Sequence, residues 1–449
     1  MNFSNVTGET LTLSTASHSG KFKPSVAAAI VIANMIGTGV FTSLGFQLLE
    51  IQSGFVLMML WAVGGVSALC GALCYAELGA ALPRSGGEYN FLTQIYHPMA
   101  GFISGWVSAT VGFAAPTALA ALTFGSYFSS AFPQLSPLWL ATGLLVFLTA
   151  IHCTSHASSG GLQSFLTALK LLLIVGFSVL ALSMVKTPQP IIFTPIKGDG
   201  ALLLGGSFAV SLIFVNYAYS GWNAATYISS ELEQPKKHLP AILITSTVLV
   251  ALCYILLNYV FLYTAPVDAM AGKVEVGYIA ARYAFGETGA NVMGVLLALL
   301  LTSTVSAMIV ACPRVLHAIG QDFPAFRELG VVNADGIPAR AILLQCGVTL
   351  LFLWTSSFES ILIFSGATMA LNTFFAVLGV FVLRWTRPEI ERPYKTWLYP
   401  LPPILFLGIT GWTLVYTVAQ RPVEALMSAG IIISGGLFYL ASVRLGSRR

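Results

Sequence analysis

The stretch VIANMIGTGVF, residues 31–41, places two glycines near the middle of the first long apolar run. Gly37 and Gly39 flank Thr38, where a membrane helix should be most regular. Inside a bilayer, irregular backbone persists only where protein buries it or where it lines a cavity, and glycine lets a ligand approach the main chain. The stretch therefore predicts a helix interrupted at a binding site. The alternative is close packing of two helices through small residues.

The composition of the whole chain indicates that its solvent is largely lipid. Of 449 residues, 56% are hydrophobic and 8% are charged, and the mean hydropathy is +0.83. Soluble domains carry about 25% charged residues, so this chain has too few to cover a water-facing surface. Apolar runs of about 20 residues, the length that crosses a bilayer, recur throughout and predict an all-α membrane protein.

Breaks between the apolar runs predict twelve transmembrane helices. These helices begin near Lys23, Phe55, Pro98, Pro137, Gly161, Leu203, Leu239, Tyr278, Pro338, Glu359, Leu398 and Pro422. Lys and Arg accumulate in cytoplasmic loops. Here fifteen of them fall on one side of the alternation and five on the other, with Lys170 inside a span. We therefore expect a multi-pass protein of the cell membrane with both termini in the cytoplasm.

The sixth span carries a second interruption. It contains NYAYSGWN, residues 216–223, a polar and glycine-containing cluster in mid-membrane. Two interrupted helices at matching positions of two five-helix halves are typical of transporters built from inverted repeats. We therefore expect helices 1 and 6 to be discontinuous.

Interrupted helices leave backbone groups that a ligand can bind. The N–H groups of residues 37–39 begin a half-helix, and such positive helix ends favour an anion. The carbonyls of residues 35–36 and those near Tyr217 and Ser220 favour a cation. A zwitterionic α-amino acid carries both charges close together. The expected substrate contacts are Met35, Ile36, Gly37, Thr38, Gly39, Tyr217, Ala218, Ser220, Gly221 and Trp222.

Several motifs together resemble those of the amino acid–polyamine–organocation superfamily of transporters. They are IGTGVF at 36–41, YAEL at 75–78, LPRSGGEY at 82–89, YSGWN at 219–223 and ELEQPKKHLPA at 231–241. The resemblance runs from about residue 23 to the end of the twelfth span. It implies the leucine-transporter fold and an amino acid substrate, with the carboxylate on the first-helix glycines and the ammonium on carbonyls of helices 1 and 6.

The implied fold divides the chain into five parts. They are a cytoplasmic tail (1–22), a first inverted repeat with helices 1–5 (23–200), a second inverted repeat with helices 6–10 (201–385), two further helices, 11 and 12 (386–443), and a second cytoplasmic tail (444–449). The N-terminal segment lacks the pattern of a cleaved signal peptide. Helices 11 and 12 hold few buried polar groups, so we expect them to act as scaffold or to pack against another subunit.

Lys170 is an ionisable residue two turns into the fifth span. Such a residue marks a functional site by default, although a lysine can also snorkel to the headgroups. The resemblance suggests that its ammonium stands where sodium sits in sodium-coupled relatives. It could then load and release a proton, or stay charged in an amino acid exchanger. The expected partners are backbone near Ala33 and hydroxyls of the eighth span, with Ser303, Thr304 and Ser306 as candidates.

The expected function is secondary active transport of a neutral amino acid by alternating access, sodium-independent and proton-coupled. The alternatives are exchange without ion coupling and transport of cationic amino acids or polyamines. No acidic residue lies near the breaks, and the pocket candidates Val40, Phe41, Tyr217 and Trp222 are apolar or aromatic, which favours neutral substrates. An enzyme is not expected, because the chain has no Gly-x-Ser-x-Gly, His-Glu-x-x-His or Walker-type motif.

No cofactor or metal is expected. His152, Cys153 and His156 have a spacing that could bind a metal, but no third strong ligand lies near them in the sequence. The expected partners are the amino acid and the lipid bilayer, not a nucleic acid. A homo-oligomer is compatible with the sequence, and no extracellular cysteine is placed to tether an obligate partner.

Two carboxylates fall near the cytoplasmic end of the second span. We expect Glu77 to cap backbone or pair with Arg84, the alternative being a proton relay. Glu88 follows Gly86 and Gly87 and is expected to shape a cytoplasmic turn and a gate network.

Overall fold

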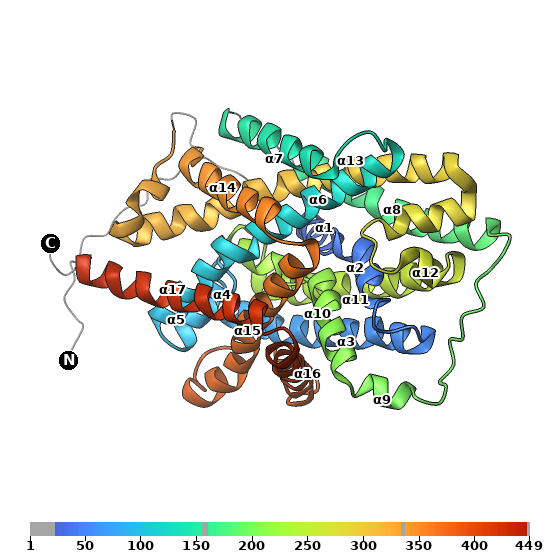
Figure 1. Ribbon diagram of the computed structural model, residues 1–449. Helices are drawn as coiled ribbons and strands as arrows, with labels where there is room; N and C mark the ends of the chain where they lie inside the picture. Colours follow the sequence, from blue (N-terminus) through green and yellow to red (C-terminus); the bar gives the residue numbers. More distant parts are fainter. Residues whose placement is uncertain (1–22, 155–159, 334–336, 447–449) are drawn as a thin grey trace.

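The computed structural model describes residues 23–154, 160–333 and 337–446, and these residues form helices and connections without a strand (Figure 1). The α-helices are α1 Pro24–Met35, α2 Gly39–Gln47, α3 Gly54–Ala81, α4 Glu88–Ile95, α5 Pro98–Val107, α6 Ala114–Ala131, α7 Pro137–Thr154, α8 Gly160–Met184, α9 Asp199–Leu203, α10 Gly206–Tyr219, α11 Pro235–Thr264, α12 Val267–Met270, α13 Val276–Asp322, α14 Ala339–Thr355, α15 Phe358–Thr386, α16 Leu401–Gln420 and α17 Pro422–Gly446. A π-helical turn, η1 Ser108–Gly112, joins α5 to α6, and two 3-10 segments are η2 Ala224–Glu231 and η3 Pro324–Gly330.

Ten segments in the described part of the chain are long and apolar enough to cross a bilayer, and α1 with α2 forms one of them. The apolar helix α14 has 17 residues and falls just short of that length. The helix α10 has 14 residues and ends at Tyr219, part-way along the sixth apolar run. The prediction of an all-α membrane protein is confirmed. The count of twelve crossings stays a prediction.

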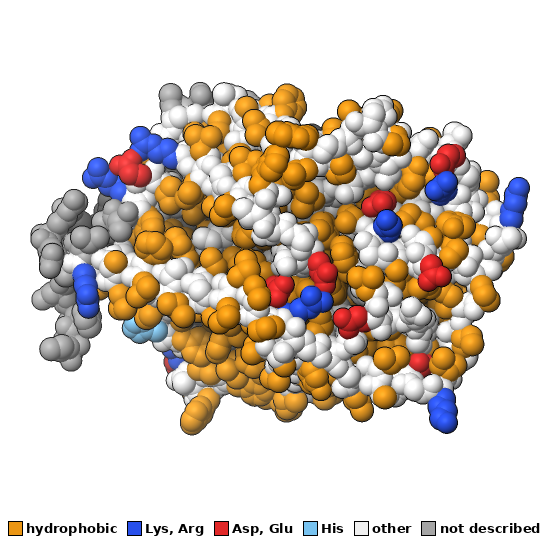
Figure 2. Space-filling view, in the orientation of Figure 1, with side chains coloured by type: hydrophobic (Ala, Val, Ile, Leu, Met, Phe, Trp, Pro, Cys, Tyr) orange, Lys and Arg blue, Asp and Glu red, His pale blue; other side chains and the backbone are white. Residues whose placement is uncertain are grey.

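The outer surface is apolar, as contact with lipid requires. Figure 2 shows one face, on which hydrophobic side chains predominate and charged ones are few. On the outer helices, Leu172, Val415 and Leu426 are more than 60% exposed. No water-soluble protein would expose large apolar side chains in such numbers, so these helices face acyl chains.

The helices with the predicted interruptions lie in the interior. In α10, eleven side chains from Phe208 to Tyr219 are buried, and in Figure 1 this helix lies in the middle of the molecule. Beside it, Tyr254 of α11 packs edge-on against Trp61 of α3 and tilted against Tyr219, with ring centroids 5.8 and 5.0 Å apart. This aromatic cluster fixes α3 and α11 against the end of α10.

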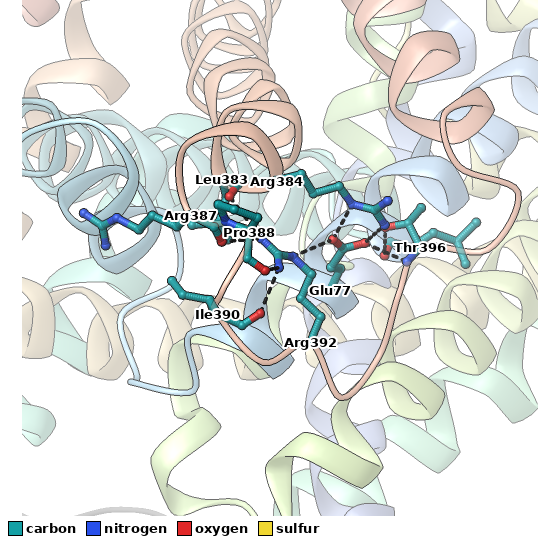
Figure 3. A network of polar contacts seen from close by, with 9 residues as sticks. Glu77, Leu383, Arg384, Arg387, Pro388, Ile390, Arg392 and Thr396 are labelled. Atoms are coloured by element: carbon teal, nitrogen blue, oxygen red, sulfur yellow. Dashed lines mark hydrogen bonds and ion pairs between the residues drawn. The ribbon is translucent and has the colours of Figure 1, made fainter.

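A buried ionic network joins the end of α3 to the end of α15 (Figure 3). Arg384 donates two hydrogen bonds to the Glu77 carboxylate, at 2.8 and 2.7 Å, and the Thr396 amide donates a third at 2.7 Å. Arg392 lies 3.7 Å from the same carboxylate. The expected pairing of Glu77 with Arg84 is therefore wrong. Arg384 in the last turn of α15 and Arg392 beyond that helix reach Glu77 because α15 packs beside α3.

Candidate functional site

The first interruption lies between α1 and α2. α1 ends at Met35, and Ile36 has ψ 79°, which turns its carbonyl out of the helix. The Gly37 amide bonds to the Met35 carbonyl at 2.8 Å, so the helical ladder stops there. α2 begins at Gly39. Its first N–H groups have no intrahelical acceptor and lie at the positive end of the helix.

The second interruption follows α10. Its last residue is Tyr219, Ser220 is extended with ψ 148°, and Gly221 has φ +98°. That left-handed conformation favours glycine. A Cβ on Gly221 would also lie 2.8 Å from the carbonyl carbon of Asn34. Gly221 is therefore required both by its backbone angle and by its contact with α1.

The two interruptions touch each other. A Cβ on Gly39 would lie 2.4 Å from the Cα of Ala218, so any side chain at position 39 would force the backbones apart. The hydroxyls of Thr38 and Tyr217 lie 3.1 Å apart. The positive end of α2 and the carbonyl end of α10 are thus within reach of one small molecule.

Tyr254 holds both broken ends in place. Its hydroxyl lies 2.5 Å from the Met35 carbonyl oxygen and 3.1 Å from the Ala218 carbonyl oxygen. A carbonyl oxygen has two lone pairs. The Met35 oxygen also accepts the Gly37 amide, so the Ala218 oxygen is the one of the two that can still accept a hydrogen bond from a ligand. Sequence reasoning missed Tyr254, because a single tyrosine in a long apolar helix carries no local signal.

A cavity of about 960 Å³ surrounds the touching interruptions. Its wall comes from α1, α2, α3, α4, η1, α6, α7, α8, α10, η2, α13, α15 and α16, and from the connection that follows α3. Nine of the ten expected substrate contacts line it, namely Met35, Gly37, Thr38, Gly39, Tyr217, Ala218, Ser220, Gly221 and Trp222. Ile36 does not line it, because its carbonyl is directed at Lys170. Among the described residues of the wall, Arg84 and Glu231 are the charged ones, and both are exposed.

One end of the cavity is closed by contacts of α2. Ser43 donates to the Phe214 carbonyl at 3.2 Å, and Tyr127 donates to the Phe41 carbonyl at 2.9 Å. Phe46 stacks between Phe214 and Phe358, with ring centroids 6.0 and 5.5 Å apart. The opposite end reaches the exposed residues 84 and 231, so the cavity opens on one side of the molecule.

Lys170 lies behind the first interruption. Its ammonium donates to the Ile36 carbonyl and to the Thr304 hydroxyl, each at 3.0 Å, and its side chain is 5% exposed. Lys170 therefore bonds to Thr304, which is one of the candidate hydroxyls. Its backbone partner is the Ile36 carbonyl, three residues beyond Ala33. The outward turn at Ile36 explains that difference.

The other two candidate hydroxyls on α13 are engaged elsewhere. Ser303 donates to the Leu300 carbonyl at 2.7 Å, and Ser306 lies 2.8 Å from His152 Nε2. Successive residues on a helix point about 100° apart, so Ser303 cannot face Lys170 together with Thr304. The expectation that Ser303 and Ser306 bind Lys170 does not match these contacts.

Glu88 links the start of α4 to the segment after the second interruption. Its carboxylate accepts hydrogen bonds from Tyr75 at 2.8 Å, Asn223 at 2.5 Å and Tyr227 at 2.5 Å, and it is fully buried. Beside it, the hydroxyls of Ser85 and Ser230 lie 2.5 Å apart. These contacts fasten η2 against the turn that Gly86 and Gly87 form, with φ +119° and +52°.

The described residues contain no cluster of three or more His, Cys, Asp or Glu side chains that could hold a metal. His152 is occupied by Ser306. His156, the other histidine of the predicted pair, lies outside the described residues.

Comparison with known proteins identifies the family of this chain. The model of the family described as amino acid permease matches residues 22–438. The chain belongs to the amino acid permeases. The resemblance to the amino acid–polyamine–organocation superfamily is thereby confirmed, and the family is one of transporters rather than enzymes.

Curated relatives of this permease are amino acid transporters by name. "Large neutral amino acids transporter small subunit 2" of Mus musculus is 30% identical over 430 residues, which cover 93% of this chain and 80% of that protein. "b(0,+)-type amino acid transporter 1" of Homo sapiens is 28% identical, covering 92% of this chain and 86% of that protein. "Asc-type amino acid transporter 1" of Mus musculus is 29% identical, covering 92% and 79%.

The permease also uses a helix that sequence reasoning assigned to scaffolding. Phe406 and Thr410 of α16 line the cavity, and the Phe406 ring lies 6.3 Å from that of Trp222. This apolar run, expected to act as scaffold or to pack against another subunit, therefore also contributes to the cavity wall. The available signal was the spacing of Thr410, Thr413 and Thr417 along one side of an otherwise apolar helix.

Proposed function

We propose that this permease is a secondary active transporter that moves a neutral amino acid across the cell membrane by alternating access. The contact between Gly39 and Ala218 carries this proposal. It brings the N–H end of α2 and the carbonyl end of α10 to one cavity, where a carboxylate and an ammonium of the same molecule can bind.

In the proposed binding mode, the two charges of the substrate have separate backbone partners. The carboxylate accepts hydrogen bonds from the N–H groups of Thr38 and Gly39, because the Gly37 amide already donates to Met35. The ammonium donates to the Ala218 carbonyl, because the Met35 and Tyr217 oxygens each already accept two hydrogen bonds. Trp222 and the Tyr217 ring cover the bound molecule. The two helix ends carry partial charges of opposite sign and add no net charge to the site. They therefore suit a zwitterion, which also has no net charge.

The electrostatics of the wall favours a neutral side chain on the substrate. Arg84 and Glu231 are the charged groups among its described residues, and both lie at the exposed mouth. A cationic or acidic side chain buried deeper would lack a partner, which is costly in a desolvated site. The cationic amino acid and polyamine alternatives are therefore disfavoured. The name of the first relative, a large neutral amino acid transporter, agrees with this choice.

We also propose the topology that the sequence predicts. α1 with α2 and α10 with η2 are the discontinuous first and sixth of twelve crossings, and α14 is the ninth. The two inverted repeats span 23–200 and 201–385, helices 11 and 12 span 386–443, and the tails 1–22 and 444–449 are cytoplasmic. The open end of the cavity then faces the cytoplasm.

We propose that Lys170 serves as a fixed cation in place of sodium. Its ammonium links α8 to the end of α1 and to α13 through Ile36 and Thr304. Proton coupling through Lys170 is the first candidate for the driving force. Exchange without ion coupling is the second. It is favoured by the absence of Lys170 from the described cavity wall, which leaves its proton no direct contact with cavity water.

We propose that the chain needs no obligate partner for transport. The relatives named "small subunit" belong by that name to larger assemblies. Five cysteines of this chain, however, lie in helices and are buried or half-buried, so none of these five is presented for a disulfide with another chain. They are Cys70, Cys74, Cys153, Cys253 and Cys346. Transport by the purified chain alone in liposomes tests this point.

Counterflow in proteoliposomes tests the proposed function. Labelled neutral amino acids are offered with and without sodium and with and without a pH gradient. Gly39→Ala should abolish uptake, because its Cβ would meet the Ala218 backbone. Gly143→Ala is the matched control, since a Cβ there meets nothing within 4 Å. Unchanged uptake in Gly39→Ala would refute the binding mode. A pH-gradient requirement separates proton coupling from exchange.

A further inference from the structure

The cavity wall includes polar side chains on α3, α10 and α16 for which no hydrogen-bond partner is found among the described residues. They are Ser67 of α3, Asn216 of α10 and Thr410 of α16. Ser67 and Thr410 are each 2% exposed, although both line the cavity. Buried polar groups are nearly always hydrogen-bonded. Groups that stay open toward a cavity therefore indicate a ligand, or the water that a ligand displaces.

Packing around Trp222 brings these three groups to one region. Gly64, Ser67 and Gly71 follow one another at helical spacing on α3. A Cβ on Gly64 would meet Val215 at 2.2 Å, and one on Gly71 would meet the Trp222 ring at 2.8 Å. Ser67 lies between these two contacts, and it therefore faces the space between the end of α10 and Trp222.

The other two groups border the same space. Asn216 is the neighbour of Val215 and precedes Ser220 by four residues. Asn216 therefore lies about one helical turn before the point where α10 ends and the chain becomes extended. Thr410 follows Phe406 by four residues on α16, and the Phe406 ring lies 6.3 Å from Trp222. Residues at positions i and i+4 share a face, so Thr410 lies one turn further along the same wall.

We infer that Ser67, Asn216, Trp222, Phe406 and Thr410 form a side-chain subsite, here called the α16 subsite. It binds the side chain of a neutral amino acid that carries a hydroxyl or carboxamide. This inference rests on the proposed function and names its substrate class. The zwitterionic head binds at the interruptions, and Asn216 lies one helical turn from Ser220, so a short side chain can reach the subsite.

The chemistry of the subsite selects polar over apolar side chains. A hydroxyl or carboxamide replaces the water on Asn216 and Thr410 with new hydrogen bonds. An apolar side chain of the same shape displaces that water and leaves the groups unpaired, which is costly. Trp222 and Phe406 supply apolar contact for the carbon atoms in both cases. A cationic or acidic side chain finds no counter-charge there.

Competition by near-isosteric pairs of amino acids tests the subsite. The purified full chain in proteoliposomes takes up labelled alanine, while threonine is compared with valine and asparagine with leucine as competitors. The wild type should bind each polar member about tenfold more tightly. Asn216→Leu and Thr410→Val should bring the ratios toward one, each ratio being measured against the alanine uptake of the same variant.

The matched control lies on the same helix. Thr413→Val makes the same change as Thr410→Val, but the Thr413 hydroxyl is fully buried, unpaired and not part of the described cavity wall. Its ratios should equal those of the wild type. If Asn216→Leu and Thr410→Val both lose alanine uptake, Ser67→Ala is measured in their place. The competition ratios of the wild type still test the subsite in that case.

The outcomes separate the two proposals. No saturable uptake or competition by any neutral amino acid would refute the proposed function. Uptake with wild-type ratios near one, or with ratios that survive Asn216→Leu and Thr410→Val, would overturn the subsite alone. Ratios that fall in both variants and hold in Thr413→Val support it.

Discussion

At the scale of single residues, glycines and one lysine set the site. Gly39 and Gly221 allow α1, α2 and α10 to meet, and each position excludes a side chain for a reason visible in the backbone. The role of these glycines could be predicted from the sequence, because a second glycine-containing break in the sixth span favoured interrupted helices over close helix packing alone. The carbonyl that receives Lys170 could not, because its direction depends on one torsion angle, ψ of Ile36.

Replacing Lys170 tests its role as a fixed cation. Lys170→Met keeps the length of the side chain but leaves the Ile36 carbonyl and the Thr304 hydroxyl unpaired. Each unpaired buried group costs about 1–3 kcal/mol. We expect the initial uptake rate to fall at least about tenfold, with a smaller loss in Thr304→Val. Rates are measured in proteoliposomes with and without sodium. Wild-type uptake in Lys170→Met without sodium would contradict this role.

At the scale of helices, the apolar runs predicted the long helices but not all of the contacts between them. The long helices follow from hydropathy alone, since each must cross about 30 Å of hydrocarbon. The short helix α4 was missed, because Glu88–Ile95 reads as a polar loop. The contribution of α16 was also missed. It depends on how α16 packs against α3 and α10, and no local pattern specifies that packing.

The Glu77 network should hold the ends of α3 and α15 together. Glu77 is 1% exposed and Arg384 is 24% exposed, and breaking a buried ion pair by removing one partner costs about 3–5 kcal/mol. We expect Glu77→Gln to lower the thermal unfolding temperature in detergent clearly, while substrate affinity is retained. The control is Glu391→Gln, whose pair with Lys236 is largely exposed and contributes less than about 1 kcal/mol. Equal effects of the two substitutions would contradict this assignment.

At the scale of the whole molecule, the cavity is closed at one end and open at the other. Ser43, Tyr127 and Phe46 bring α2 against its neighbours at the closed end. Residues from the first, second, third, sixth, eighth, tenth and eleventh apolar runs meet around the cavity. The sequence indicated the two interrupted helices. It could not show which end is closed, because that depends on contacts between residues far apart in the chain.

Labelling of single cysteines tests the direction of opening. In a cysteine-free background, Ser220→Cys should react with a membrane-impermeant thiol reagent added from the cytoplasmic side, and substrate should slow the reaction. Ser43→Cys should stay unreactive, because it lies among the closing contacts. Reaction of Ser220→Cys from the extracellular side alone would show that the orientation is the reverse.

The central claim is that the two interruptions bind both charges of one zwitterion. The most direct measurement is binding of a neutral amino acid to the purified chain, compared with its decarboxylated amine and its des-amino acid, by calorimetry. We predict saturable binding of the zwitterion, and at least about a hundredfold weaker binding of each analogue, because each leaves one end of the broken helices unpaired. Binding of either single-charge analogue as tight as that of the amino acid would contradict the account.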